Sequence, residues 1–239
     1  MDYRGEGRGE PSAGLPPSAF VAFIQNHDQV GNRAFGDRIG ALAPPEAVRA
    51  ISAVYLLLPQ VPMLFMGEEW MASQPFPFFR DFDGELAEAV RKGRRDEFAK
   101  LPEFQDEKMR ECIPDPQSPE TFVAAKLGWD AVTSGAHAAA LAWHQRILAV
   151  RKHRVVPLIP RIGGYAGKFI VIGEAAVVVS WGLGDGAETL MSATNLSANS
   201  MPGFPAANGS VIWSEGYADD TELGPWTVRW SIGLSKGIK

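Results

Sequence analysis

Two short apolar runs stand out in the first third of the chain. Residues 20–25 (FVAFIQ) and 61–67 (VPMLFMG) are almost continuously hydrophobic, as strands are when both faces of a parallel sheet are covered. Between them, residues 44–60 (PPEAVRAISAVYLLLPQ) show a helical pattern with one broad apolar face. Pro45 suits a first helical turn, and Pro59 ends the pattern. The order strand, helix, strand predicts a parallel α/β unit.

The middle of the chain has two further helical patterns, at residues 84–101 and 135–154. The first carries a basic run at residues 91–95, which is typical of a solvent-exposed helix face with surface ion pairs. The second begins with an alanine-rich stretch of high helix propensity and ends with basic residues that suit the helix dipole.

From about residue 155 the pattern changes to short β-type runs separated by Gly, Asn, Asp and Pro. Such spacing predicts a small antiparallel sandwich or barrel. In the last run, Trp230 alternates with Val228, so we expect both to face inward. The predicted domains are therefore an α/β part at residues 1–154 and an all-β part at 155–239. The six runs cover residues 155–160, 168–173, 175–182, 187–197, 210–216 and 226–232.

Composition narrows the possible partners and compartment. The chain of 239 residues has a net charge of −5 and a pI near 5.4, which gives no electrostatic footprint for nucleic acid or an anionic membrane. No signal peptide or membrane-spanning run is expected. The single cysteine, Cys112, cannot form an internal disulfide and fits a reducing cytoplasm. The absence of a Cys/His cluster predicts no metal, and no cofactor is expected.

Polar side chains follow both apolar runs. Asn26, His27 and Asp28 come directly after the first, and residues 68–70 (Glu-Glu-Trp) come after the second. Functional groups of α/β proteins gather at the carboxyl ends of parallel strands, so we expect a site there. A plainer interpretation is that a residue after the strand caps a helix or forms a turn.

The ligand class is suggested by the residues that come next. Gln29, Asn32 and Arg33 add planar hydrogen-bonding groups, which are costly to bury unless they bind something equally polar. Sugars fit, because they offer hydroxyls to such groups and apolar ring faces to aromatic residues. The aromatic residues of 70–79 could supply those faces, or they could pack the loop that contains them.

These stretches resemble a known family. FIQNHDQVGNRAFGDR, residues 23–38, resembles the fourth signature region of the alpha-amylase superfamily of glycoside hydrolases, where a His-Asp pair closes the seventh strand of a (β/α)8 barrel. PMLFMGEEW, residues 62–70, resembles the eighth strand, and PWTVRWSI, residues 225–232, resembles the closing strand of the C-terminal domain. The resemblance implies an α/β plus all-β fold. Residues 1–154 would hold the last two βα units of a TIM barrel, and 155–239 a small antiparallel β-sandwich.

The resemblance also implies roles for particular residues. Asp28 would be a catalytic carboxylate that grips sugar hydroxyls and stabilises the oxocarbenium-like transition state, and His27 would bind the same sugar. The longer form of the motif is similar to that of hydrolases which cut the α-1,4 bond beside the terminal trehalose of maltooligosyltrehalose. The implied partner is therefore this substrate or another α-1,4-glucan. The implied substrate-binding residues are Asn26, Gln29, Asn32, Arg33, Glu69 and Trp70.

A retaining glycosidase also needs a nucleophile and an acid/base carboxylate. Neither of the superfamily's corresponding motifs occurs in this sequence. We therefore expect the chain to be the C-terminal part of a longer enzyme and to be inactive alone. Two alternatives remain: a fragment of a related glucan branching enzyme, and a non-catalytic glucan-binding or interaction module. In the second, tryptophans of the β part would be sugar platforms. We favour the other interpretation of these tryptophans, which is that they pack in the core. They are Trp181, Trp213, Trp226 and Trp230.

Overall fold

The computed structural model describes residues 2–3, 6–7, 9–184 and 186–234. The chain forms two compact units, each assembled from separate stretches. The first, which we call the sheet unit, comprises Met1–Ala22, Arg49–Met63 and Gln145–Lys239. The second, the loop unit, comprises Phe23–Val48 and Leu64–His144. The sheet unit thus draws on both sides of residue 154, and the two-domain division expected there stays a prediction.

The predicted strand, helix, strand order is present in a short form. Strand β3, Val21–Ala22, pairs in parallel with β4, Val61–Pro62, and helix α3, Pro45–Leu57, lies between them in sequence. The N–H of Met63 donates to the carbonyl of Ala22 at 2.9 Å. Each strand is two residues long, whereas the apolar runs predicted six or seven. The described residues show this parallel pair and not a (β/α)8 barrel.

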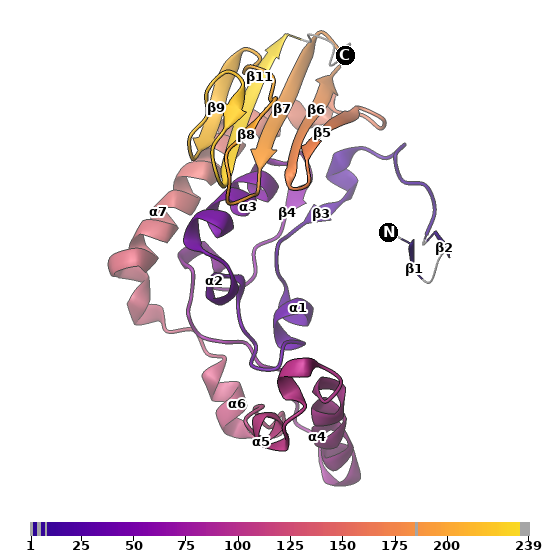
Figure 1. Ribbon diagram of the computed structural model, residues 1–239, viewed down its shortest axis with the longest axis vertical. Helices are drawn as coiled ribbons and strands as arrows, with labels where there is room; N and C mark the ends of the chain where they lie inside the picture. Colours follow the sequence, from indigo (N-terminus) through magenta and orange to yellow (C-terminus); the bar gives the residue numbers. More distant parts are fainter. Residues whose placement is uncertain (1, 4–5, 8, 185, 235–239) are drawn as a thin grey trace. The chain divides into compact units, whose positions relative to one another are not determined.

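The C-terminal part is an antiparallel sheet of five strands in the order β5-β6-β7-β11-β9 (Figure 1). A two-stranded sheet, β8 with β10, accompanies it. Five of the six predicted β-type runs are confirmed. The run at residues 155–160 was predicted wrongly, because residues 156–161 form a 3-10 helix, η6, Val156–Arg161, with Pro157 in its first turn and Pro160 inside it. The strands are β5 Gly167–Gly173, β6 Ala176–Leu183, β7 Glu188–Asn195, β8 Met201–Pro202, β9 Ser210–Glu215, β10 Glu222–Leu223 and β11 Thr227–Leu234.

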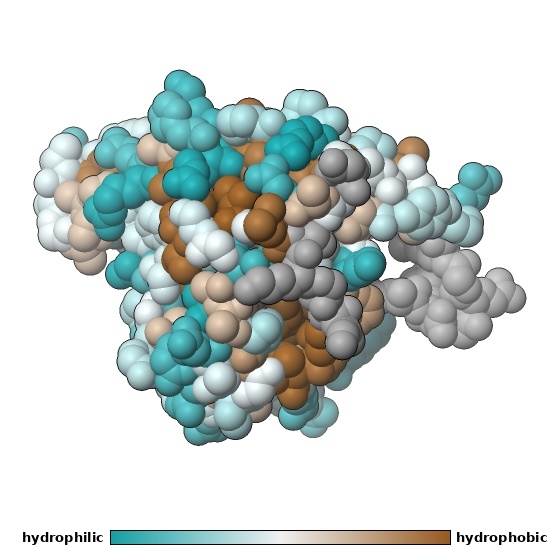
Figure 2. Space-filling model, turned by 90° about the horizontal axis from the view of Figure 1, so that it is seen from above, coloured by the Kyte–Doolittle hydropathy of each residue, from teal (hydrophilic) through white to brown (hydrophobic). Residues whose placement is uncertain are grey.

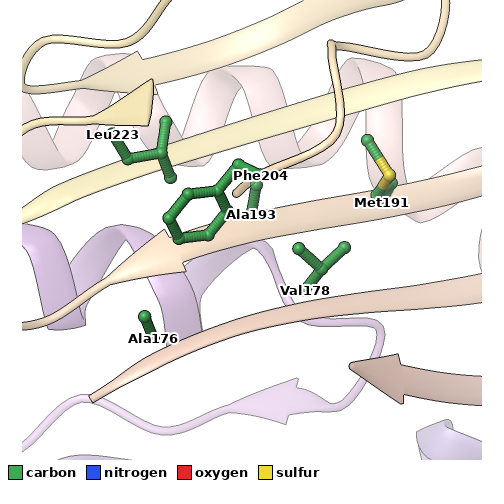
Figure 3. Close-up of a cluster of buried hydrophobic side chains, with 6 residues drawn as sticks. All are labelled: Ala176, Val178, Met191, Ala193, Phe204 and Leu223. Atoms are coloured by element: carbon green, nitrogen blue, oxygen red, sulfur yellow. The ribbon is translucent and has the colours of Figure 1, made fainter. Parts of the chain in front are cut away.

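Each face of the sheet packs against something different. On one face, the ring of Phe204 covers Val178 and Ala193 from the loop that follows β8 (Figure 3). Leu223 of β10 completes this apolar cluster and is fully buried. Every second side chain of β6 and β7 points to this face, because strands have a period of two, and Ala176, Val178, Met191 and Ala193 enter the cluster in this way.

On the opposite face, Trp230 and Trp181 stack with ring centroids 5.8 Å apart and planes at 9°. Trp230 is fully buried, and its Nε1–H donates to the carbonyl of Ala53 in α3 at 3.0 Å. The prediction that Val228 and Trp230 face inward is confirmed, since both are 0% exposed. Trp181 is also buried, so neither of these two rings is a surface platform for a sugar.

Helix α7, Gly135–Val150, continues into a π-helical turn, η5, Arg151–Val155. Arg151 at this turn is buried, and its guanidinium donates to the carbonyls of Leu56 at 3.0 Å, Leu58 at 2.5 Å and Gln60 at 2.7 Å. The Leu56 carbonyl lies in the last turn of α3, and those of Leu58 and Gln60 follow its end, so all three lack helical partners. A positive charge is favoured there by the helix dipole, so Arg151 closes α3 and fixes the approach to β4.

The loop unit is built mainly of short helices around helix α4, Gly84–Phe98. Arg94 of α4 belongs to the basic run for which the sequence predicted a solvent-exposed face, and that prediction is wrong for this residue. Arg94 is 7% exposed, and it donates to the carbonyls of Gly31 at 2.6 Å and Arg33 at 2.7 Å. The other helices are α1 His27–Gly31, α2 Ile39–Leu42, η2 Glu68–Trp70, η3 Pro102–Phe104, α5 Glu107–Glu111, α6 Pro119–Ala124 and η4 Trp129–Thr133.

Two short elements precede β3: an antiparallel pair formed by β1, Asp2–Tyr3, and β2, Glu6–Gly7, and the 3-10 helix η1, Pro17–Ala19. Within the described part of the chain, no helix has the length and apolar character needed to cross a bilayer. Nor do the described residues bring three His, Cys, Asp or Glu side chains together in a way that could hold a metal ion.

Candidate functional site

The predicted site begins with a capped helix. Helix α1 starts at His27, directly after Asn26, whose backbone is extended. The Oδ1 atom of Asn26 accepts a hydrogen bond from the N–H of Gln29 at 2.9 Å. This N-cap satisfies a backbone donor that has no helical partner. The plainer interpretation of the sequence, a helix cap after the strand, therefore applies to Asn26 and leaves Asp28 free for another role.

His27 and Asp28 lie in the first turn of α1 and are strongly exposed. Their side chains are 71% and 73% exposed, and His27 Nε2 lies 3.4 Å from Asp28 Oδ1. Asn32 follows Asp28 by four residues, with its N–H bonded to the Asp28 carbonyl at 3.0 Å, so both are on one side of the turn. Among the described residues, the Asp28 carboxylate has no partner besides His27. Its oxygens are thus open to a ligand's hydroxyls.

A buried hydrogen bond joins the residues before α1 to the residues after β4. Gln25, 3% exposed, donates from Nε2 to Glu68 Oε2 at 3.1 Å, and its Oε1 accepts from the N–H of Ile39 at 3.1 Å. Glu68 Oε2 also accepts from the N–H of Phe65 at 3.2 Å. These bonds tie the two predicted site stretches together, because a buried amide and a buried carboxylate require such partners.

Arg38 adds a second link between the same stretches. It is 5% exposed and donates to the carbonyls of Gln74 and Met66, both at 2.6 Å. Its guanidinium also lies over the ring of Phe65, 5.0 Å from the centroid. Burial lowers the pKa of Arg38, while the charges of Glu68 and Glu69 oppose that shift. Arg38 therefore acts as a scaffold for the site loops.

Glu69 and Trp70 lie in the 3-10 helix η2, which begins after Gly67 in the left-handed region at φ 80°. Trp70 is 2% exposed and packs against Trp129 with centroids 4.8 Å apart. Its carbonyl oxygen lies 2.9 Å from His137 Nδ1. Glu69 is half-buried. Trp70 thus offers no exposed ring face, and substrate roles for these two residues stay predictions.

The remaining predicted residues divide by exposure. Gln29 is exposed on α1, as Asn32 is. Arg33 is half-buried, and its Nη1 donates to the Asp37 carbonyl at 2.6 Å, which closes the turn after α1. The structure therefore gathers the residues of α1 into one exposed turn. Glu69 and Trp70 lie on the second stretch, which is linked to the first through Gln25, Glu68 and Arg38.

The aromatic residues after η2 pack on one another. Phe76 contacts Phe65 and Phe79 edge to face, with centroids 5.2 and 5.6 Å apart, and Phe79 contacts Phe122 at 5.2 Å. Gly36 sits beside this row with φ 69°, and a Cβ there would overlap the backbone of Phe76 and Pro77. Of the two interpretations of these aromatics, loop packing is the one that this geometry favours.

Part of this chain is similar in sequence to known proteins. A protein from Deinococcus radiodurans named malto-oligosyltrehalose trehalohydrolase is 43% identical over 145 residues, which is 61% of this chain and 24% of that protein. A trehalohydrolase from Saccharolobus solfataricus is 40% identical over 129 residues, 54% of this chain and 21% of that protein. Over these stretches the chain is a homologue of malto-oligosyltrehalose trehalohydrolases. The resemblance drawn from the motifs is confirmed.

This chain spans about a quarter of the length of the trehalohydrolases that it matches. Residues 166–230, which include most of the five-stranded sheet, match a family described as "Domain of unknown function (DUF3459)". The trehalohydrolase relationship therefore concerns only part of those proteins.

The chain is also similar to proteins of solved structure. A Salmonella typhimurium protein provisionally described as an alpha amylase superposes with a TM-score of 0.87 at 39% identity, over 96% of this chain and 38% of that one. A trehalose-6-phosphate hydrolase from Bacillus licheniformis superposes with a TM-score of 0.52 at 14% identity, over 89% of this chain and 43% of that one. At that identity, the second likeness concerns the fold alone.

The motif pointed to residues of α1 and did not show what holds that helix. Glu68 was recognised only as part of the polar stretch at residues 68–70, and Gln25 was given no role. The bonds of Gln25 and Arg38 were missed because nothing in a local pattern marks a bond across 43 or 36 residues of sequence. A weak signal was available: Gln25 ends an apolar run, and a buried amide there needs a partner.

Proposed function

We propose that this chain supplies part of the active site of a glycoside hydrolase that acts on malto-oligosyltrehalose. The enzyme would hydrolyse the α-1,4-glucosidic bond next to the terminal trehalose and release trehalose. The observation that carries the proposal is the exposed Asp28, free of helix capping and paired with His27, in a chain with trehalohydrolase homologues. A neutral, hydroxyl-rich substrate matches an exposed carboxylate and imidazole side by side.

In this proposal Asp28 accepts hydrogen bonds from two hydroxyls of the sugar that is cleaved. Its negative charge stabilises the positive charge that develops on the ring as the glycosidic bond breaks. His27 donates from its ring N–H to the same sugar. Asn32, on the same side of α1, extends the row of polar groups. Asn26 acts indirectly, since its side chain holds the first turn of α1 in place.

The wider placement belongs to the same proposal. We assign β3 and β4, with the helices after them, to the last two βα units of a (β/α)8 barrel, and the five-stranded sheet to the C-terminal domain. The nucleophile and the acid/base would come from a part of the barrel that this sequence does not encode. Without these two carboxylates, the chain alone should not release trehalose.

A chimera tests the proposal. The homologous segment of the Deinococcus radiodurans relative is replaced by this chain, and trehalose release from maltotriosyltrehalose is measured. We expect turnover by the chimera and none by the isolated chain. Asp28→Asn should lower kcat at least about a thousandfold with little change in thermal stability, because only charge stabilisation in the transition state is lost.

The matched control is Asp83→Asn in the same chimera. Asp83 precedes α4, and its side chain makes no capping hydrogen bond, so the same loss of charge should leave kcat within about twofold. Turnover that survives Asp28→Asn would remove the assigned role of this carboxylate. Sustained trehalose release by the isolated chain would show that the essential carboxylates lie within it.

A further inference from the structure

A groove opens on the outer face of the five-stranded sheet, away from α3. Its volume is about 900 Å³, which is within the range of ligand pockets. Its floor is formed by the side of β5, β6 and β7 that carries Lys168, Ser180 and Met191, neighbours in register across the three strands. Phe204, from the loop after β8, forms a wall and also covers the apolar cluster in Figure 3.

The groove has mixed chemistry, and none of the described residues that line it is acidic. Ile170 and Met191 give apolar surface, and Thr189 and Asn208 give hydroxyl and amide groups. Figure 2 shows hydrophobic surface between hydrophilic residues on the face that it views. The charged lining residues are Arg161 and Lys168. Arg161 is already paired with Glu188 at 2.8 Å, so the groove is not built for a strongly anionic ligand.

Ser180 supplies a hydroxyl to the floor of the groove. The residue is 5% exposed and is part of the lining, so a ligand in the groove could hydrogen-bond to it. The hydroxyls of Ser192 and Thr194, which bond to each other at 3.0 Å, lie on the opposite face of β7 and do not line the groove.

Tyr165 stands at the rim of the groove in an unusual backbone conformation. Its side chain is 81% exposed, and its backbone lies in the left-handed region at φ 57°. A bulky residue is strained there. The strain is held by contacts to the segment before β3: Tyr165 N–H donates to the Ala13 carbonyl at 2.8 Å, and Gly164 packs on the backbone of Gly14. Neither strain nor exposure of the ring stabilises the fold.

We propose that this groove binds an α-1,4-glucan chain, separately from the site on α1. Tyr165 offers a ring face to a glucose unit, and Ser180, Thr189 and Asn208 hydrogen-bond to sugar hydroxyls along the floor. Glycine at position 182 leaves room for the chain, since a Cβ there would meet nothing within 4 Å. The choice of an α-glucan over another oligosaccharide rests on the proposed function. The groove would hold a long substrate by a second point of contact.

Calorimetric titration of the full chain with maltoheptaose tests the inference. We expect binding that weakens at least about tenfold in Tyr165→Gly, which removes the ring and relieves the left-handed backbone. Gly182→Phe should weaken binding to a similar degree by filling the groove from its floor. The melting temperature should change little in either variant, because Tyr165 is 81% exposed and a Cβ at position 182 would meet nothing within 4 Å.

Two variants separate this site from its alternatives. Phe169→Ala, on the opposite face of β5 and 71% exposed, should leave the affinity unchanged, whereas Asp28→Asn reports on the separate site on α1. Absence of maltoheptaose binding, or binding that survives both groove variants, overturns the inference. Binding lost only in Asp28→Asn also overturns it while supporting the proposed function. Equal binding of cellohexaose overturns the assignment to an α-glucan.

Discussion

The sheet unit and the loop unit are specified by different kinds of information. In the sheet unit, the face to which a side chain points follows from its place in the strand: Val228 and Trp230, two residues apart, point to the same face and are both fully buried. In the loop unit, the site helix α1 has five residues and little apolar burial of its own. Its conformation is held by single polar bonds from distant residues, such as Gln25 to Glu68 and Arg94 to Gly31.

This difference shows where stability and function lie. Most substitutions on the buried face of the sheet would remove apolar contact area and so lower the stability of the fold. The exposed face of α1 can be altered at little cost to folding, because among the described residues the side chains of Asp28 and His27 pair with each other and with no other group. Residues that contribute least to stability are thus the ones available for chemistry.

The strongest test of this contrast is Trp230→Ala. The indole is fully buried, stacks on Trp181 and donates to the Ala53 carbonyl. Its removal should lower the free energy of unfolding by about 3–5 kcal/mol through lost contact and a residual cavity. Denaturant unfolding measures the change, and hydrogen exchange should show faster opening of β6, β7 and β11.

The control for this change is Val171→Ala at the edge of the same sheet. Val171 is 65% exposed, so the variant should stay within about 0.5 kcal/mol of the parent. If Trp230→Ala proved as mild as Val171→Ala, the sheet would not depend on its alternating buried face, and the first half of the comparison would fail.

The sheet could be predicted from the sequence because its signals are local. Alternation, turn residues and run length located five strands, and the alternation of Trp230 with Val228 gave the direction of both side chains. The failure at residues 155–160 is also local in origin: the apolar content of VVPLIP suggested a strand, but Pro157 and Pro160 direct the backbone into the 3-10 helix η6.

The site could be predicted only in part. The motif indicated which side chains of α1 are exposed, and the apolar runs indicated a parallel pair. The runs did not show that β3 ends after Ala22. Gln25, at the end of the first run, lies outside the strand and bonds to Glu68. Arg94 was expected in solvent since a basic run looks the same whether or not carbonyls of a distant turn accept from it.

Gly36→Ala is the second test, and it probes the loop unit. Position 36 has φ 69°, and a Cβ there would overlap the backbone of Phe76 and Pro77. The Gly36 carbonyl also accepts from the N–H of Phe76 at 2.8 Å, so the two segments cannot easily separate. We expect a loss of roughly 2–4 kcal/mol in the free energy of unfolding, measured by denaturant titration.

Gly93→Ala is the matched control for Gly36. It lies inside α4, and a Cβ there would meet nothing within 4 Å. Alanine is the better helix former, so this variant should gain about 0.5–1 kcal/mol. Opposite signs for the same substitution would show that tertiary contact, rather than glycine content, fixes the site loop. Equal, small effects would argue against that dependence.

The smallest expected effect concerns pH and His144, near the end of α7. The ring is 5% exposed, with Nδ1 3.0 Å from the Ala140 carbonyl and the edge of Trp143 4.8 Å away between centroids. Burial lowers the pKa of His144, and the Ala140 carbonyl and the charge of Glu69 only partly oppose this. The folded chain therefore holds this imidazole neutral at a pH where the unfolded chain protonates it.

The sign of the pH dependence follows from that difference. Below about pH 6.5 the unfolded state binds a proton at position 144 that the folded state resists, so the free energy of unfolding should fall as pH decreases. The loss should continue until the folded pKa is passed. His144→Phe should flatten the stability curve between about pH 7 and 5, whereas His153→Phe, at an exposed position of η5, should not. If the stability curve has the same slope in the parent and in His144→Phe, this buried ring is not held neutral by its packing. Buried polar groups would then contribute less to the stability of the loop unit than the comparison with the sheet unit assumes.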